Sequence, residues 1–421
     1  MSSPLESKAP DSSSLGCAEI GTCSRASQKG LTNFRSHGGV PTHKDMREEE
    51  DVSNATAKSI LLGLNWLDRF LTLFIILAMI IGVVIGEFAP NVNSTLNKGN
   101  LKGVSAPLVV GLIVMMWPIL TKVPYEQLPK TFKSSKIWLQ ILLSLILNWV
   151  IGPFLMLGIA WATLPDLEEY RIGIIMVGLA RCIAMVMIWN KIARGDASVC
   201  AILVIINSIL QIVLYAPFSL WFVNVISGSQ SYKLDYGDTA ISVLIYLGIP
   251  LISGVLTRFL IIRTAGRAFF ERKFLHFFGP LSLVGLLYTI IIIFAEQAKH
   301  ILHNLGPTFR TFVPLVLYFA IMWTLAFFLV WHFSKRYGHE NWGYQMAVVQ
   351  AFTAGSNNFE LAIAVCVSVY GADSNQALAA TIGPLVEVPV LLALSWIALY
   401  AGQKLRWSSA SKEQGIDRTS P

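Results

Sequence analysis

The chain has 421 residues, of which 54% are hydrophobic and 14% are charged, and its formal net charge is +7. With a mean hydropathy of +0.59, this composition excludes an ordinary soluble domain and indicates a protein that crosses a membrane several times. The basic residues lie in short loops between apolar runs, so the positive charge is a topology signal and not a nucleic-acid surface.

Residues 1–58 are rich in Ser, Gly, Thr, Lys and Glu and contain few large apolar residues. Such a segment cannot bury enough surface to offset the entropy of ordering, so we predict a disordered tail. It lacks the apolar stretch of a cleaved signal peptide. Cys17 and Cys23 lie in this tail, where we expect free thiols of no defined role. A second polar tail is expected at 406–421.

Ten apolar segments between the tails are long enough to cross about 30 Å of hydrocarbon at 1.5 Å per residue. The sequence therefore predicts a transporter-like domain at 59–405 with ten transmembrane helices. The predicted spans are 67–86, 104–120, 137–161, 172–189, 199–223, 239–262, 274–294, 311–333, 342–370 and 376–401.

Lys and Arg gather in alternate loops, as at 122–136, 191–194, 258–273 and 335–336, whereas the loops between them are poorer in Lys and Arg and often acidic. The positive-inside rule places the basic loops in the cytosol. An even number of spans then puts both termini on the cytosolic side as well.

The chain contains a weak internal repeat. The motif APLVVG at 106–111 resembles GPLSLVG at 279–285, Gly82 in the first span has a counterpart in Gly254 in the sixth, and Asp196 lies 177 positions before Asp373. A repeat of five spans must be inverted in the membrane because five is odd. Inverted repeats with a site on broken helices near the midplane are typical of secondary transporters.

The two least membrane-compatible stretches fall at equivalent places in the repeat. ARCIAMVMIWN at 180–190 carries Arg181 and Cys182, although a charge at membrane depth costs about 2.5–3.5 kcal/mol on insertion scales. AGSNNFELAIA at 354–364 carries small and amide-bearing residues, which favour an unwound segment. We therefore predict interrupted fourth and ninth spans. The candidate site residues in the second stretch are Ser356, Asn357, Asn358 and Glu360.

Each of these side chains suggests a role. Cys182 is a soft sulfur ligand, and the adjacent Arg181 would favour its thiolate. The apolar surroundings of Glu360 disfavour its ionised form, which suits a group that carries a proton. Glu387 lies between Pro384 and Pro389 in the tenth span, which we expect to be kinked.

Some alternatives stay open at this point. Arg181 needs an anionic partner, and either Glu360 or Glu387 could be that partner while the other carries the proton. Cys200 and Cys366 have no adjacent charge and fit small buried hydrophobes. We interpret Asn148, Asn207 and Gln211 as polar contacts between helices.

The sequence lacks the motifs of several other activities. We find no Gly-x-x-x-x-Gly-Lys-Ser/Thr loop, no His-Glu-x-x-His and no Gly-x-Ser-x-Gly. These absences disfavour an ATP-driven pump and an intramembrane hydrolase. We therefore expect neither an enzyme nor a cofactor.

The motifs ARCIAMVMIWN, SNNFELAIA at 356–364, GPLVEVPVL at 383–391 and LNWVIGPFLM at 147–156 resemble those of the arsenite efflux permeases of the arsenical-resistance family, and most closely its yeast-like members. The resemblance implies the ten-span fold of the bile acid/arsenite/riboflavin transporter superfamily. It further implies a core of spans three to five and eight to ten, a panel of spans one, two, six and seven, and broken fourth and ninth spans that cross.

The resemblance also implies an activity, which is export of trivalent arsenic, and in some members antimonite, in exchange for protons. It places the functional cysteine at Cys182 and the functional glutamates at Glu360 and Glu387, and it implies the plasma membrane, with the vacuolar membrane as the alternative. Arsenite would bind Cys182, as a metalloid, while the other candidate side chains bind its hydroxyls. The competing interpretations are a sodium-coupled organic-anion carrier on the same fold and a membrane receptor or enzyme.

Overall fold

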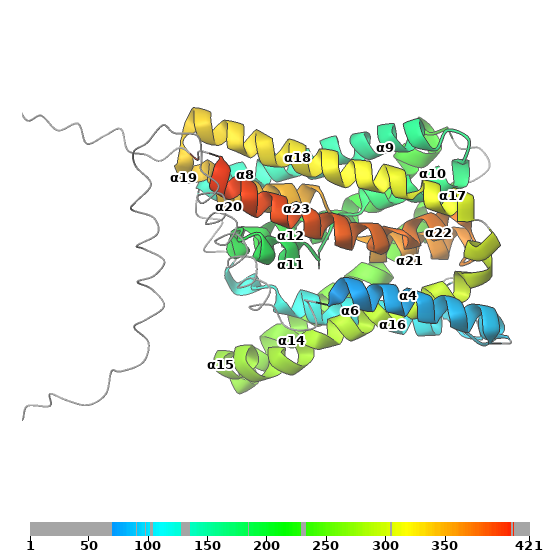
Figure 1. Ribbon diagram of the computed structural model, residues 1–421. Coiled ribbons are helices and arrows are strands. Elements are labelled where there is room, and N and C mark those ends of the chain that lie inside the picture. The colour runs from blue at the N-terminus through cyan, green and yellow to red at the C-terminus, as the bar shows by residue number, and fades with distance from the viewer. Residues whose placement is uncertain are drawn as a thin grey trace, which may run out of the picture. The chain divides into compact units, whose positions relative to one another are not determined.

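The structure is a computed structural model that describes residues 70–89, 91–96, 98–101, 104–127, 135–183, 185–228, 233–303, 305–405 and 407. The predicted tails at 1–58 and 406–421 lie outside these residues, apart from Trp407. Helices make up nearly all of the regular structure that is described (Figure 1). The exception is a short antiparallel pair formed by β1 (Asn100–Leu101) and β2 (Val104–Ser105).

Among the described residues, six helices are long and apolar enough to cross a bilayer, namely Ile137–Thr163, Ala197–Ile226, Tyr236–Ala265, Arg267–His303, Leu305–Tyr337 and Asn375–Lys404. Shorter apolar helices occur at Leu73–Phe88, Ala106–Lys122 and Phe359–Tyr370. Helices suit a bilayer because they satisfy their own backbone hydrogen bonds. The chain is therefore an all-α polytopic membrane protein, as its composition predicts.

The first half of the described chain contains helices that follow the first five predicted spans. They are α4 (Leu71–Phe88), α5 (Val92–Leu96), α6 (Ala106–Lys122), η1 (Tyr125–Gln127), α8 (Ser135–Ile146), η2 (Leu147–Ile151), α9 (Gly152–Thr163), α10 (Glu168–Leu179), α11 (Met185–Ile192), α12 (Ala197–Leu220) and η3 (Trp221–Ile226).

The second half follows the remaining predicted spans in the same way. Its helices are α13 (Tyr236–Val243), η4 (Leu244–Gly248), α14 (Ile249–Ala265), α15 (Arg267–Phe269), η5 (Phe270–Phe274), α16 (Leu275–His303), α17 (Leu305–Arg310), α18 (Phe312–Tyr337), α19 (His339–Trp342), α20 (Tyr344–Ala354), α21 (Phe359–Tyr370), α22 (Asn375–Thr381) and α23 (Gly383–Lys404).

Three of the four wide helical turns in the described residues lie beside a proline, which lacks a backbone donor; the exception is η5. The π turn η2 precedes Pro153, η4 precedes Pro250, and η3 follows Pro217. A proline inside a helix cannot donate to the carbonyl four residues earlier and clashes with it. The neighbouring turn widens instead, so that the Gly152 N–H donates to the Leu147 carbonyl, five residues back.

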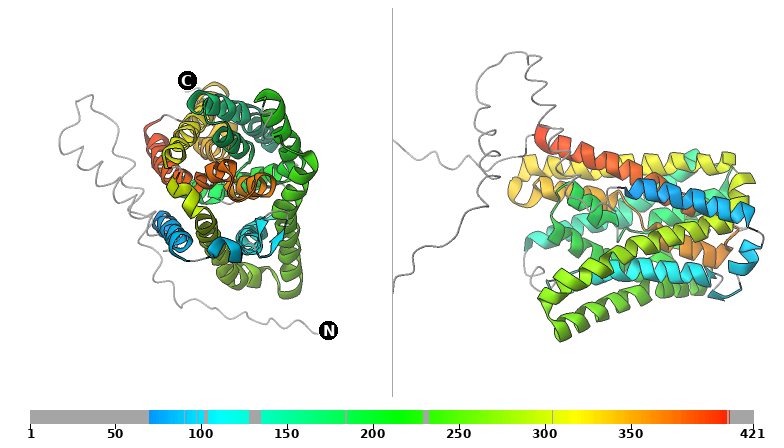
Figure 2. Two further views of the ribbon diagram at one scale, coloured as in Figure 1. Left: turned by 90° about the vertical axis from the view of Figure 1, so that its right-hand side faces the viewer. Right: turned by 60° about the horizontal axis from the view of Figure 1, so that its bottom comes forward.

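Small residues allow α4, α6, α14 and α16 to pack closely. In Figure 2 the blue α4 and the cyan α6 lie beside the yellow-green α16, and α14 packs against α6. A Cβ on Gly82 would lie 2.7 Å from the Ile291 carbonyl oxygen of α16, and one on Gly254 would lie 2.9 Å from the backbone of Leu120 in α6. Backbones that approach this closely require glycine, as is common between membrane helices.

The remaining long helices pack around the two interrupted ones. α18 contacts α9, α20 and α23, while α10 contacts α9 and α22. A Cβ on Gly173 of α10 would lie 2.4 Å from the Gln376 carbonyl oxygen at the start of α22. These contacts bury most of the two polar stretches at 180–190 and 354–364, where the candidate site lies.

Candidate functional site

The fourth and ninth predicted spans are each broken into two helices, α10 with α11 and α20 with α21. The two breaks meet. Arg181 and Asn357 form an isolated antiparallel bridge, and the Asn358 N–H donates to the Ala180 carbonyl over 3.1 Å. The two unwound segments therefore pair with each other.

The amide side chains at the second break satisfy backbone groups that the interruption leaves free. Asn357 Nδ2 donates to the carbonyls of Val177 and Ala180 at 2.9 and 3.0 Å, and Asn358 Oδ1 accepts from the Leu361 N–H at 3.1 Å. The ends of helices have such free groups, and these amides cap them. The other polar atom of each amide, Asn357 Oδ1 and Asn358 Nδ2, is buried and has no hydrogen-bond partner in the described ranges.

Cys182 lies at this crossing and is 3% exposed. Its sulfur accepts a hydrogen bond from the Val186 N–H at the start of α11, at 3.3 Å. The Ser356 hydroxyl lies within hydrogen-bond reach of the sulfur and also donates to the Phe352 carbonyl at 2.7 Å. The structure thus brings the predicted thiol of one break against the predicted hydroxyl of the other.

Glu387 approaches the same crossing from α23 and is 2% exposed. Its carboxyl group lies close to the Asn357 backbone N–H, and Oε1 has no hydrogen-bond partner among the described residues. Glu360, in the first turn of α21, is close enough to interact electrostatically with both Glu387 and Cys182. The predicted thiol and both predicted carboxyl groups are therefore neighbours.

The tenth span is interrupted where a kink was expected. α22 ends at Thr381 and α23 begins at Gly383, with Pro384 in its first turn. A Cβ on Gly383 would overlap the ring of Phe359, at 1.7 Å from its Cδ1. This glycine therefore lets the start of α23 approach α21, and the approach brings Glu387 to the crossing.

Arg181 does not pair with either glutamate, which corrects the expectation from the sequence. Its guanidinium is fully buried and donates from Nη1 to the Tyr318 hydroxyl at 2.9 Å, while Nε and Nη2 have no hydrogen-bond partner within the part of the chain that is described. No salt bridge joins it to a carboxylate among the described residues. The charged groups that act on the Cys182 sulfur include Glu387 and Glu360.

The chain is similar in sequence to a transporter family and to several individual transport and resistance proteins. Residues 109–304 match the model of the Sodium Bile acid symporter family. The arsenical-resistance protein Acr3 of Corynebacterium glutamicum is 40% identical over 347 residues, which are 81% of this chain and 91% of that protein. The chain belongs to the arsenical-resistance family of transporters.

Two other relatives agree with this assignment. The Acr3 protein of Alkaliphilus metalliredigens is 32% identical over 342 residues, which cover 79% of this chain and 92% of that protein. An uncharacterized transporter of Synechocystis sp. is also 32% identical, over 82% of this chain and 91% of its own length.

Two residues outside the predicted site set help to build the site of this arsenical-resistance family member. Gln211 of α12 makes a contact between helices, as expected, and this contact is to both backbone groups of Arg181. Its Oε1 accepts from the Arg181 N–H at 2.9 Å and its Nε2 donates to the Arg181 carbonyl at 2.8 Å. Tyr318 links the guanidinium to the end of α20 by donating to the Ala354 carbonyl at 3.2 Å. In the sequence, the only indication of a role for Gln211 or Tyr318 is that each is a polar residue within an apolar span.

The other polar residues of the spans have separate roles. Asn207 accepts a hydrogen bond from Trp149 Nε1 at 3.1 Å, which is a contact between helices as expected. The expectation for Asn148 was wrong, because its Nδ2 donates four residues back along the chain, to the Ser144 carbonyl at 2.8 Å. Cys200 and Cys366 are free and buried, in agreement with their interpretation as small hydrophobes.

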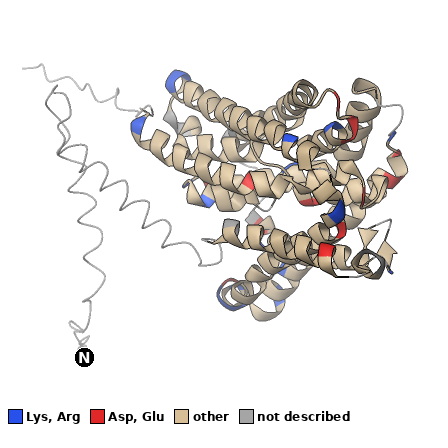
Figure 3. Cartoon of the chain, turned by 45° about the vertical axis from the view of Figure 1, so that its right-hand side comes forward, with Lys and Arg blue, Asp and Glu red and all other residues tan. Residues whose placement is uncertain are grey.

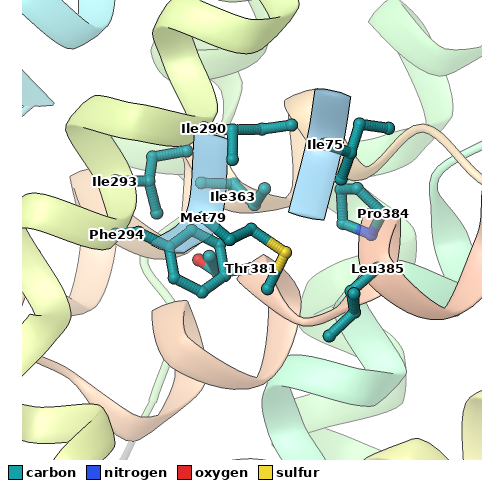
Figure 4. A pocket seen from close by; sticks show the side chains of 9 residues that line it. All are labelled: Ile75, Met79, Ile290, Ile293, Phe294, Ile363, Thr381, Pro384 and Leu385. Carbon is teal, nitrogen blue, oxygen red and sulfur yellow. The ribbon is translucent and has the colours of Figure 1, made fainter. Parts of the chain in front are cut away.

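An apolar pocket adjoins the crossing (Figure 4). Its wall includes Ile363, one turn after Glu360 in α21, and Pro384, one turn before Glu387 in α23. The other lining residues come from α4, α16, the end of α22 and the start of α23, namely Ile75, Met79, Ile290, Ile293, Phe294, Thr381 and Leu385.

The chemistry available at the crossing is that of one thiol, one hydroxyl and two carboxyl groups. No group of three or more His, Cys, Asp or Glu side chains suited to a metal ion occurs in the described part of the chain. A single thiol can bind a soft centre reversibly, and an adjacent carboxyl group can accept or supply a proton.

Proposed function

We propose that the protein exports trivalent arsenic from the cytosol in exchange for protons and so confers arsenic resistance. The observation that carries the proposal is the convergence of Cys182, Ser356, Glu360 and Glu387 where the two broken helices meet. The arsenical-resistance names of two relatives support the choice of cargo.

Arsenite at neutral pH is an uncharged trihydroxide with a thiophilic centre, which suits a buried thiol. In one form of the proposal the Cys182 sulfur bonds to arsenic, one As–O bond breaks, and the thiol proton leaves with that hydroxyl as water. In the other, the thiol only hydrogen-bonds the cargo. The free atoms Asn357 Oδ1 and Asn358 Nδ2 would hydrogen-bond the remaining hydroxyls. The same chemistry would admit antimonite.

The two carboxyl groups supply the proton step. A proton that reaches Glu360 from outside would favour release of the cargo, and its discharge to the cytosol would reset the carrier. Because Arg181 is not paired with a carboxylate, Glu387 is available to share that proton. Exchange of a neutral cargo for a proton moves positive charge inward, so the membrane potential would assist export by about 2.3 kcal/mol per 100 mV.

We further propose the ten-span inverted repeat, with a panel of spans one, two, six and seven and a core of the others. Its support lies in paired glycine contacts. Gly82 of the first span contacts the seventh span, and Gly254 of the sixth contacts the second. Gly111 and Gly285 face each other's helices across α6 and α16. An inverted repeat relates span one to span six and span two to span seven, so it predicts that such glycine contacts occur in matched pairs.

The proposed location is the plasma membrane with both termini in the cytosol. Basic residues lie in the turns around Arg194, Arg272 and Arg336, whereas Glu168 and Asp373 lie in alternate loops. Export from the cell requires this membrane, whereas sequestration in a vacuole would serve the same resistance. Protease protection of tagged termini in sealed vesicles tests the orientation.

Arsenite uptake into everted vesicles under an imposed pH gradient tests the function. We expect Cys182→Ser to abolish uptake and Cys366→Ser, at another buried thiol, to preserve it. Glu360→Gln should uncouple any residual uptake from the pH gradient. Full uptake by Cys182→Ser would remove the thiol from the mechanism, and antimonite in the same assay defines the cargo range.

A sodium-coupled organic-anion carrier is the second candidate, because the matched family model is that of sodium bile acid symporters. The same vesicles distinguish the two. Uptake that depends on a sodium gradient and is indifferent to pH would favour the second candidate. Membrane insertion without any restored arsenite tolerance in an efflux-deficient cell would instead favour a receptor or an enzyme.

A further inference from the structure

The turn between α14 and α16 combines basic residues and exposed aromatic rings. Between Arg258 and Phe277 the chain has five Arg or Lys residues and only one acidic residue, Glu271. Phe277 is 79% exposed and Phe269 is 42% exposed. The turn lies at one end of the helices, with Lys and Arg shown in blue in Figure 3.

Part of this turn is firmly attached to α6 and α16. Phe270 is fully buried, and its ring stacks on Phe274, which stacks on Phe278 at centroid distances of 5.7 and 4.8 Å. Phe278 in turn meets the edge of Trp117 of α6 at 5.6 Å. This aromatic column fixes the inner side of the turn against its neighbours.

The charges in the turn fall into two sets. Arg258 is buried and forms two hydrogen bonds with Glu126, at 2.8 and 2.5 Å, and Arg267 pairs with Glu271 at 2.8 Å. The second set is Arg263, Arg272 and Lys273, which are exposed. Within the described residues none of these three has an ion pair. They form a surface of unpaired positive charge on a rigid support.

The depth of the turn in the membrane identifies its partner. The turn joins two helices that are long and apolar enough to span a bilayer, Tyr236–Ala265 and Arg267–His303, and a turn between two spans lies near the level of the lipid headgroups. Exposed aromatic rings are enriched at that level, and Lys and Arg next to a membrane helix attract anionic lipid. An acidic soluble partner would need no exposed Phe269 or Phe277.

We propose that Arg263, Arg272 and Lys273 bind the phosphate headgroups of anionic phospholipids, with Phe269 and Phe277 inserted among the acyl chains. Because the aromatic column joins the turn to α6 and α16, bound lipid would hold these helices in place while the cargo site moves. The inference does not depend on the identity of the cargo.

Lipid retention tests the proposal without any transport assay. The full chain is purified from vesicles of phosphatidylcholine with phosphatidylserine, and bound lipid is measured by native mass spectrometry. For Arg272→Gln with Lys273→Gln we expect about a fivefold weaker retention of phosphatidylserine per charge removed, as ~1 kcal/mol per basic residue implies. The matched comparison, Lys335→Gln with Arg336→Gln, removes the same charge at the end of α18, where only two basic residues adjoin one exposed ring, and it should weaken phosphatidylserine retention clearly less than the α14–α16 variant does.

Two results would overturn the proposal. One is retention of phosphatidylserine by the α14–α16 variant at the parental level, and the other is equal loss in both double variants, which would indicate a non-specific effect of net charge. A folding defect is recognised separately, because thermal unfolding in detergent should be the same for the parent and both variants.

Discussion

At the scale of single residues, the space around the Arg181 guanidinium depends on Gly152. A Cβ added there would lie 2.9 Å from Arg181 Nη1 and 3.0 Å from the Tyr318 hydroxyl. We expect Gly152→Ala to displace the guanidinium and to destabilise the protein by about 1–3 kcal/mol, as overpacking of a well-packed interior does. Thermal unfolding in detergent, together with arsenite uptake, measures the effect.

Gly158 is the matched control because it lies in the same helix, α9, and a Cβ there would meet nothing within 4 Å. Gly158→Ala should leave uptake unchanged and raise stability by up to about 1 kcal/mol, since alanine is the better helix former. Equal loss of uptake in both variants would refute the role assigned to Gly152.

The sequence predicted the chemistry of individual site residues better than their partners. A thiol and two carboxyl groups within apolar runs were recognisable because such groups are costly in a membrane. Sequence alone could not show that Arg181 turns toward Tyr318, because that direction is set by helices that are distant in the chain. For the same reason Gly152 carried no signal.

At the scale of elements, Gln211 keeps the break between α10 and α11 open. Its amide satisfies both backbone groups of Arg181, as a neighbouring strand would. Gln211→Leu leaves these two buried groups without that partner, and an unsatisfied buried group costs about 1–3 kcal/mol. We expect a lower unfolding temperature and loss of arsenite uptake.

Ser208→Ala is the control for Gln211, since Ser208 lies one turn away and its hydroxyl donates only to the Val204 carbonyl of its own helix. It should change stability by no more than about 0.5 kcal/mol. Normal uptake by Gln211→Leu would show that the break needs no such support.

The contact between α6 and α14 depends on pH through Glu126, which lies in η1. The Arg258 guanidinium hydrogen-bonds the ionised carboxylate and holds the pKa of Glu126 below its ordinary value of 4.5. The pair therefore stabilises the fold fully above that value, and the contribution is lost as the pH falls through the lowered pKa.

We expect Glu126→Gln to reduce stability at neutral pH by about 1–3 kcal/mol, since Arg258 is buried and loses a charged partner. The difference from the parent should shrink as the pH falls below 4.5. Thermal unfolding over a pH series measures it. Glu271→Gln, which breaks only an exposed pair with Arg267, should have little effect at any pH. A difference that persists unchanged into acid would contradict the assigned ion pair.

The positions of the elements were largely predictable, since long apolar runs and prolines are visible in the sequence. Both breaks fall within the stretches that small, amide-bearing or charged residues had indicated. The pairing of the two breaks was not predictable in detail, because it depends on Asn357 and Asn358 capping helices instead of facing only a ligand. One polar atom of each amide caps a helix, which leaves the other, Asn357 Oδ1 or Asn358 Nδ2, without a partner among the described residues.

At the scale of the whole molecule, a chain of polar contacts joins α16 to the segment before α22. Gln297 Nε2 donates to the Ala372 carbonyl at 2.9 Å, and His300 Nε2 lies 2.7 Å from Asn375 Oδ1. Asn375 also donates to Glu169 at the start of α10. In the proposed arrangement α16 belongs to the panel, whereas α10 and α22 belong to the core. These contacts must therefore break if the core moves relative to the panel to release cargo at this end of the helices.

Reversible cross-linking tests this requirement. In a chain with Cys17→Ser and Cys23→Ser, we expect His300→Cys with Asn375→Cys, bridged by a short bifunctional thiosulfonate reagent, to stop arsenite uptake, and a reductant to restore it. The control pair, Trp117→Cys with Thr257→Cys, joins α6 to α14, whose side chains already touch at 2.9 Å. Because both helices belong to the proposed panel, its bridge should leave uptake intact. Continued uptake with the first bridge closed would mean that α16 and the start of α22 move together, and the division into panel and core would then have to be redrawn.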